Sequence, residues 1–175
     1  MDAMQRRRRV SLRQMRIGHA RVASIFKIGS AAVCHLAGRA REFSVVEAAA
    51  DDLAVAGQIF DDFLDMAEDA SRGHLNYAAR FILGASVPAD AGSEKVVNLI
   101  ADRLIRSDRV GRLFDEIIGH AEAARHALAP LNLPEAEPYF SDYRRALEAT
   151  AAALGRERAS RMIDTIYAAG GLGRS

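Results

Sequence analysis

The sequence predicts an all-α fold, a helical bundle of about six or seven helices built as a single domain. Half of the 175 residues are hydrophobic, only 6% are aromatic and just four are proline. Alanine, leucine and arginine, which have high helix propensity, are abundant. Apolar residues also recur at the three- and four-residue spacing of helices, and the length suffices for one domain with a substantial core. These observations favour packed helices over sheets.

Two long helices are expected in the first part of the chain. The first covers residues 11–39, where Ser11 is a candidate N-cap. The second covers about 45–71, where Ser44 and Glu47 have the spacing of a capping box. Gly38 lies near the end of the first expected helix, and Gly73 follows the second and can end it.

Five shorter helices are expected in the rest of the chain. Their ranges are 75–83, 94–106, 108–129, 135–153 and 156–169. Residues 84–93, GASVPADAGS, are rich in turn formers and predict a surface loop. Pro130 and Pro134 mark one connection, and Gly155 marks another. The expected organisation is a basic tail over 1–10, a single helical domain over 11–170 and a flexible tail over 171–175.

Charge is strongly segregated along the chain, although the net charge is only +1. Residues 1–41 carry ten Lys or Arg and one acid, whereas residues 42–71 carry nine acids and no base. The basic start of the chain could contact nucleic acid or another anionic surface. A helical nucleic-acid-binding regulator is therefore one alternative function. It would need further basic residues on the body of the protein, and residues 72–175 are nearly neutral, so nucleic acid is not the expected partner.

The sequence predicts neither export nor a membrane span. The single Cys34 excludes an intrachain disulfide and suits a reducing compartment, so a cytoplasmic protein is expected. No apolar run approaches the roughly 20 residues that are needed to span a bilayer. Charged residues also follow the basic N-terminus at the place where a signal peptide would be apolar.

The second long helix carries a stripe of negative charge. Its segment FDDFLDMAED places five acids in the nine positions from Asp61 to Asp69. At about 100° per residue, these acids share an arc of about 120° with Gln58 and Arg72. Like charges four residues apart destabilise a helix, so a cationic partner is expected. Asp61 and Asp65 can converge on Mg²⁺, which binds carboxylates, phosphate oxygens and water.

Three segments resemble the class I isoprenoid synthases. GQIFDDFLDMAED resembles the second aspartate-rich motif of the trans-isoprenyl diphosphate synthases, and EDASRG resembles the end of that helix in squalene and phytoene synthases. RIGHARVASIFKIGSAAVCHLAGR is similar to the preceding long helix, in which Lys27 stands at the place of a diphosphate-binding lysine. HAEAARHALAPLNLPEAEPYFSDYRRALEA resembles a later pair of helices. Because it has no first aspartate-rich motif, the chain resembles the C-terminal half of such a synthase.

The resemblance implies a Mg²⁺-dependent prenyltransferase or a terpenoid synthase-like protein that binds an isoprenyl diphosphate. The implied catalytic residues are Asp61, Asp62 and Asp65, the implied metal ligands are Asp61, Asp65 and Asp69, and the implied substrate-binding residues are Lys27, Gln58 and Arg72. An apolar cavity walled by Phe60, Phe63 or Phe26 would protect the allylic cation from water.

Half of the isoprenoid synthase fold would leave apolar helix faces exposed. Self-association, or a partner chain that supplies the missing N-terminal half, is therefore expected. A non-catalytic subunit of a prenyl synthase complex is the second alternative function.

Overall fold

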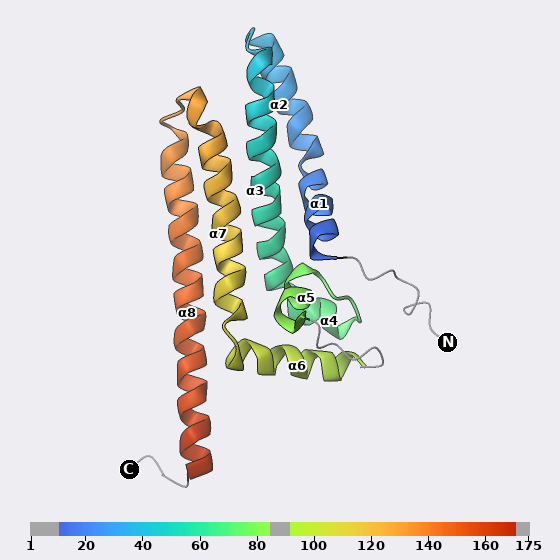
Figure 1. Ribbon diagram of the computed structural model, residues 1–175, viewed down its shortest axis with the longest axis vertical. Helices are drawn as coiled ribbons and strands as arrows, with labels where there is room; N and C mark the ends of the chain where they lie inside the picture. The colour runs from blue at the N-terminus through green and yellow to red at the C-terminus, as the bar shows by residue number, and fades with distance from the viewer. Residues whose placement is uncertain (1–10, 85–91, 171–175) are drawn as a thin grey trace, which may run out of the picture.

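The computed structural model describes residues 11–84 and 92–170, except for the side chains at positions 25, 158, 159 and 161–170. Within these ranges it contains eight α-helices, two short 3-10 helices and no strand, so the all-α prediction is confirmed (Figure 1). The α-helices are α1 (Leu12–Val22), α2 (Ser24–Leu36), α3 (Phe43–Leu64), α4 (Met66–Ser71), α5 (Tyr77–Leu83), α6 (Ser93–Arg106), α7 (Arg109–Leu128) and α8 (Ala136–Gly170). The 3-10 helices are η2 (Ala40–Glu42) and η4 (Ala129–Leu131). The expected tails and most of the expected loop over 84–93 lie outside the described residues.

The bundle is organised around α3 and α7, which pack along each other (Figure 1). Helices α1 and α2 lie along the other side of α3, and α8 lies along the other side of α7. The short helices α4 and α5 and the crossing helix α6 close one end of the bundle. Helix α3 therefore has neighbours on several sides, and this position decides what its acidic side chains contact.

The first predicted helix is interrupted by a buried junction. Ser11 caps α1 as predicted: its hydroxyl accepts a hydrogen bond from the Gln14 N–H, and the Gln14 side chain accepts one from the Ser11 N–H. The prediction of one continuous helix over 11–39 is wrong, because α1 ends at Val22 and α2 begins after Ala23. Ala23 is almost fully buried, so packing rather than a local breaker residue sets this junction.

The second predicted helix begins and bends differently from the prediction. The capping box is wrong, because η2 leads directly into α3 and Ser44 lies inside the helix. The expected single helix over 45–71 also divides at Asp65 into α3 and α4. No glycine or proline stands at this bend; buried Met66 and Ala70 instead share a core with helix α6. Gly73 follows α4 with a φ of 79°, as expected for a residue that ends a helix.

The last two predicted helices are one helix. Gly155 lies inside α8, so the connection predicted there is wrong. A glycine inside a helix costs about 1 kcal/mol relative to alanine, which packing on the neighbouring helix can offset. Ala151 and Leu154 supply such packing beside the main core. The connection marked by Pro130 and Pro134 is confirmed: η4 and a left-handed Asn132 join α7 to α8.

The core lies between α3, α5 and α7. Its largest fully buried side chains are Tyr77, Phe114, Ile59, Ile82, Leu83, Leu113, Ile117 and Leu147. Phe60 and Phe63 each pack edge-to-face with Phe114, at ring-centroid distances of 6.2 and 5.2 Å. Phe26, by contrast, is 69% exposed on α2 and lies apart from these two aromatic side chains.

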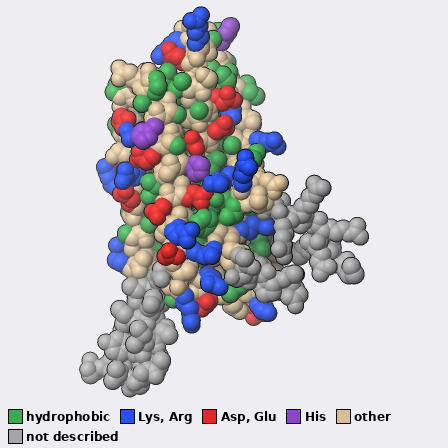
Figure 2. Space-filling view, viewed as in Figure 1, with side chains coloured by type: hydrophobic (Ala, Val, Ile, Leu, Met, Phe, Trp, Pro, Cys, Tyr) green, Lys and Arg blue, Asp and Glu red, His purple; other side chains and the backbone are tan. Residues whose placement is uncertain are grey.

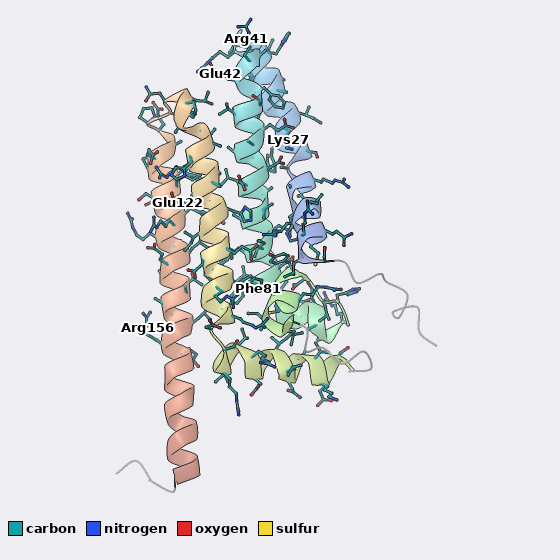
Figure 3. The ribbon with its side chains drawn as sticks, in the orientation of Figure 1. Lys27, Arg41, Glu42, Phe81, Glu122 and Arg156 are labelled. Carbon is teal, nitrogen blue, oxygen red and sulfur yellow. The ribbon has the colours of Figure 1, made fainter. Side chains whose placement is uncertain are left out.

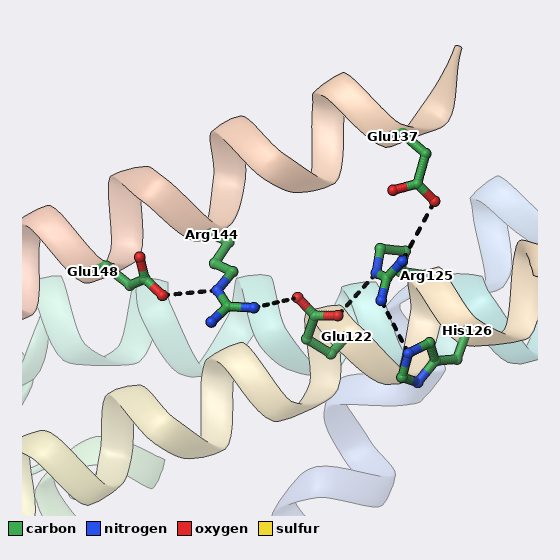
Figure 4. A network of polar contacts seen from close by, with 6 residues as sticks. All are labelled: Glu122, Arg125, His126, Glu137, Arg144 and Glu148. Carbon is green, nitrogen blue, oxygen red and sulfur yellow. Dashed lines mark hydrogen bonds and ion pairs between the residues drawn. The ribbon is translucent and has the colours of Figure 1, made fainter. Parts of the chain in front are cut away.

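An ion-pair network fixes α8 alongside α7 (Figure 4). The Glu122 carboxylate of α7 accepts from Arg125 at 2.9 Å and from Arg144 of α8 at 3.2 Å. Arg144 also contacts Glu148 at 2.7 Å, and Arg125 reaches Glu137 at 3.5 Å. Arg125 above all, and Arg144 with it, lower the pKa of Glu122. These pairs are partly or fully exposed, so they specify the register of α8 more than they stabilise the fold.

Candidate functional site

Three acids in the first part of α3 contact basic side chains of neighbouring helices. Lys27 of α2 places its ammonium 2.6 Å from Asp51 and 3.4 Å from Glu47. On another side of α3, Nδ1 of His120 from α7 lies 2.8 Å from a carboxylate oxygen of Asp52. These three acids precede the stripe, so their contacts do not supply the cationic partner that was expected for Asp61–Asp69.

Asp62 is turned into the bundle and holds the start of α5. Its carboxylate accepts a hydrogen bond from the buried Tyr77 N–H at 2.8 Å and lies 3.5 Å from Nε2 of His19. Burial raises the pKa of Asp62, and the Tyr77 N–H, His19 and Gln58 oppose that rise. Burial lowers the pKa of His19, while the charge of Asp62 opposes the decrease. Nδ1 of His19 is buried and has no hydrogen-bond partner among the described residues.

A second polar contact lies next to this pair and was not predicted. The Tyr77 hydroxyl donates to Glu116 of α7 at 2.5 Å, and Arg16 of α1 donates to the same carboxylate oxygen at 2.9 Å. Burial, followed by the hydrogen bond to Glu116, raises the pKa of Tyr77. Together with His19 and Asp62, these residues tie α1, α3, α5 and α7 together. No spacing rule identifies such a group, because its members come from four separate helices.

Asp69 also has a structural role. Its carboxylate accepts a hydrogen bond from Nδ2 of Asn76 at 2.9 Å, and the same nitrogen donates to the backbone carbonyl of Asp62 at 2.7 Å. Oδ1 of Asn76 in turn accepts from the Ala79 N–H and caps α5. Asp69 therefore holds the turn between α4 and α5.

Asp61 and Asp65 are the exposed pair of the acidic stripe. Both side chains are exposed, and neither makes a hydrogen bond or ion pair within the described part of the chain. The Asp65 N–H donates to the Asp61 carbonyl at 2.9 Å, so the one-turn spacing of the two residues is kept up to the bend. Asp61 faces towards α8, where its charge contributes to a raised pKa of Tyr143 that is caused mainly by burial.

The predicted substrate-binding side chains are not brought together. Lys27 pairs with Asp51, ten residues before Asp61 and therefore about 15 Å away along α3. Figure 3 shows Lys27 beside the middle of α3, well away from Phe81 of α5. Gln58 acts on Asp62, and Arg72 pairs with Glu68 at 2.5 Å on the exposed side of α4. No three His, Cys, Asp or Glu side chains of the described ranges lie close enough together to hold a metal ion.

An apolar cleft of about 430 Å³ lies between α6, α7 and α8. Its lining includes Phe63, Leu104, Ile105, Val110 and Leu154. Phe63 is two positions beyond Asp61, which turns it about 200° around the helix. The cleft and the exposed acidic pair thus lie on different sides of α3.

Large apolar side chains are exposed along α1 and α2. They are Ile17, Val22, Phe26, Ile28, Val33 and Leu36. A helical projection of the sequence could have revealed this surface, but only with knowledge of which side of the helix faces α3. None of the described helices is long and apolar enough to cross a membrane.

Comparison with known proteins yields no relative. No protein-family model, curated protein or solved structure matches the chain. The resemblance to isoprenoid synthases therefore rests on the sequence segments that carry it.

Proposed function

We propose that the chain binds the diphosphate group of an isoprenyl diphosphate through Mg²⁺ held by Asp61 and Asp65. The observation that supports this proposal is how the acids of the stripe are used. Asp62 and Asp69 hold the start of α5, and Glu68 pairs with Arg72. Within the stripe, the two exposed acids without a polar partner among the described residues are Asp61 and Asp65, the pair at the spacing expected of metal ligands.

Two carboxylates suit this ion, because Mg²⁺ usually takes one or two protein carboxylates and completes its coordination with water and phosphate oxygens. When bound, the ion would neutralise charge that develops on a departing diphosphate. Asp61 and Asp65 would position the diphosphate at the end of α3. Asp62 would act indirectly, by holding the adjoining turn through the Tyr77 N–H.

A partner that covers this end of α3 is part of the proposal. Leu64 lies next to the acidic pair and is 61% exposed, although it is a large apolar side chain. A second copy or another chain seated over Leu64 would enclose the diphosphate and exclude water. The same observation supports the second candidate function, a non-catalytic subunit of a prenyl synthase complex.

Calorimetric titration with pyrophosphate, in the presence and absence of Mg²⁺, tests the proposal. The wild type should bind pyrophosphate only with Mg²⁺, and Asp61→Asn/Asp65→Asn should weaken binding by tenfold or more, which corresponds to about 1.4 kcal/mol. Asp115→Asn/Asp142→Asn is the matched control, because it also removes two exposed acids and should bind like the wild type. A folded wild type that binds no pyrophosphate with Mg²⁺ would refute the proposal.

A further inference from the structure

Helix α2 exposes large apolar side chains, whereas an ordinary amphipathic helix turns such side chains towards the protein. The side that faces α3 carries small or polar residues such as Lys27 and Cys34. The large apolar side chains face away from the bundle: Phe26, Ile28, Val33 and Leu36 are 69%, 72%, 67% and 86% exposed. We call these four residues the α2 outer face. At about 100° per residue they occupy an arc of about 160°.

The α2 outer face contains no charge. Lys27, the only Lys, Arg, Asp or Glu in α2, is turned towards α3. Its hydrogen bond to Asp51 raises the pKa of the ammonium group, which keeps the charge paired on the inner side of the helix. Gly29 and Ala32, the other residues within the exposed arc whose side chains are described, are small. An uncharged apolar surface of this extent is characteristic of a region that contacts a partner or a lipid surface.

Basic residues border the α2 outer face at both ends. Arg21 is exposed at the end of α1, next to the start of α2, and Arg41 is exposed just beyond the end of α2. Arg13 is exposed further away, near the start of α1. None of the three pairs with an acid in the part of the chain that the structure describes. An apolar face bordered by arginines is typical of helices that lie in the interface of an anionic bilayer.

The same charges oppose the pairing of two copies through this face. A parallel arrangement would bring Arg21 close to Arg21 of the other copy, and an antiparallel one would bring Arg21 close to Arg41. Like charges at an interface suppress such an association. An anionic lipid surface, by contrast, matches both the apolar face and its basic border.

We infer that the α2 outer face binds the surface of an anionic phospholipid bilayer. The helix would lie parallel to the membrane, with Phe26 and Leu36 at the boundary between headgroups and acyl chains. Arg13, Arg21 and Arg41 would contact the lipid phosphates. This inference is independent of the diphosphate proposal, because the α2 outer face does not include Asp61 or Asp65.

A tryptophan reporter tests the inference, since the chain has no Trp of its own. Phe26→Trp replaces an exposed aromatic side chain and should leave the helical circular dichroism spectrum unchanged. Its fluorescence should shift to the blue with phosphatidylglycerol vesicles, but not with phosphatidylcholine vesicles or inorganic phosphate. Tyr139→Trp is the matched control, because Tyr139 is a similarly exposed aromatic residue on α8 and its fluorescence should not shift.

Two further variants separate the apolar and basic contributions. In the Phe26→Trp background, Val33→Gln/Leu36→Gln should abolish the shift at every salt concentration. Arg13→Gln/Arg21→Gln should weaken binding most at low salt, because screening at about 0.5 M NaCl already weakens the attraction of the wild type. The absence of a shift with phosphatidylglycerol vesicles would overturn the inference. A blue shift that appears without vesicles and disappears on dilution would overturn it as well, in favour of self-association.

Discussion

Asp61 and Asp62 are neighbours in the sequence, and the structure predicts opposite consequences of replacing them. Asp62→Ala leaves the buried Tyr77 N–H without its acceptor and removes the contact with His19. A hydrogen bond to a charged group contributes about 1.5–3 kcal/mol, and an unsatisfied buried donor adds a similar cost. Removing the carboxylate also removes the cost of burying it, which is visible in the raised pKa of Asp62. The net loss of unfolding free energy should be about 1.5–2 kcal/mol.

Asp61→Ala should leave stability unchanged or raise it by about 0.5 kcal/mol. The Asp61 side chain is exposed and has no hydrogen-bond or ion-pair partner within the described residues. Its replacement relieves repulsion from Asp65 and introduces a better helix former. The two alanine variants are therefore matched in sequence position and in charge removed, and differ in what each carboxylate contacts.

Urea unfolding followed by far-ultraviolet circular dichroism measures the free energy of unfolding of both variants. In thermal unfolding of a chain of this size, a loss of 1.5–2 kcal/mol should also lower the melting temperature by about 3–8 °C. Asp62→Asn retains an oxygen that can accept from Tyr77, so its stability should lie between those of the wild type and Asp62→Ala. Equal stability of Asp61→Ala and Asp62→Ala would refute the assignment of Asp62 as the residue that anchors α5.

Two further predictions follow from individual contacts. Gly155→Ala should raise the unfolding free energy by about 0.5–1 kcal/mol, because Gly155 lies inside α8 with open space around it; destabilisation in thermal unfolding would contradict a continuous α8. The pKa of His19 is lower in the folded chain than in the unfolded chain, because the side chain is buried. As the pH falls below about 6.5, His19 therefore becomes protonated in the unfolded chain before it does so in the folded chain. This difference lowers the free energy of unfolding below that pH. The wild type should therefore lose more stability than His19→Gln between about pH 7.5 and pH 5.5. Parallel losses in urea titrations at the two pH values would show that His19 contributes nothing to this dependence.

Composition and periodicity were sufficient to predict an all-α chain, and local chemistry predicted individual helix ends. Ser11 caps α1 through its own hydroxyl, and Gly73 follows α4 in a conformation that few other residues adopt. Both features depend on residues within a few positions. The junctions at Ala23 and Asp65 and the continuity of α8 through Gly155 depend on packing between distant segments. Local sequence signals cannot predict them for that reason.

The acidic stripe illustrates the same limit at the candidate site. Its spacing predicted that so much negative charge needs partners, but the identity of those partners could not be read from a helical projection. Asp62 contacts His19 and the Tyr77 N–H, and Asp69 accepts a hydrogen bond from Asn76. Only the packing of α1, α3 and α5 brings these groups together, and Asp61 and Asp65 have no such partner among the described residues. The Mg²⁺ site at Asp61 and Asp65 stays a prediction.

The opposite charges of the first two segments of the chain thus have a common structural explanation. Where α2 packs on α3, Lys27 and Asp51 pair with each other, and Figure 2 shows basic and acidic side chains interspersed over one face of the molecule. What stays unpaired within the described residues lies away from that contact. On one side are the arginines that border the α2 outer face, and on the other are Asp61 and Asp65 at the end of α3.

Each surface favours a ligand of the opposite sign, so a bilayer and a Mg²⁺-bound diphosphate would not compete for the same residues. Vesicle binding by Asp61→Asn/Asp65→Asn should accordingly match that of the wild type, and a loss of vesicle binding in this variant would show that the two surfaces are coupled.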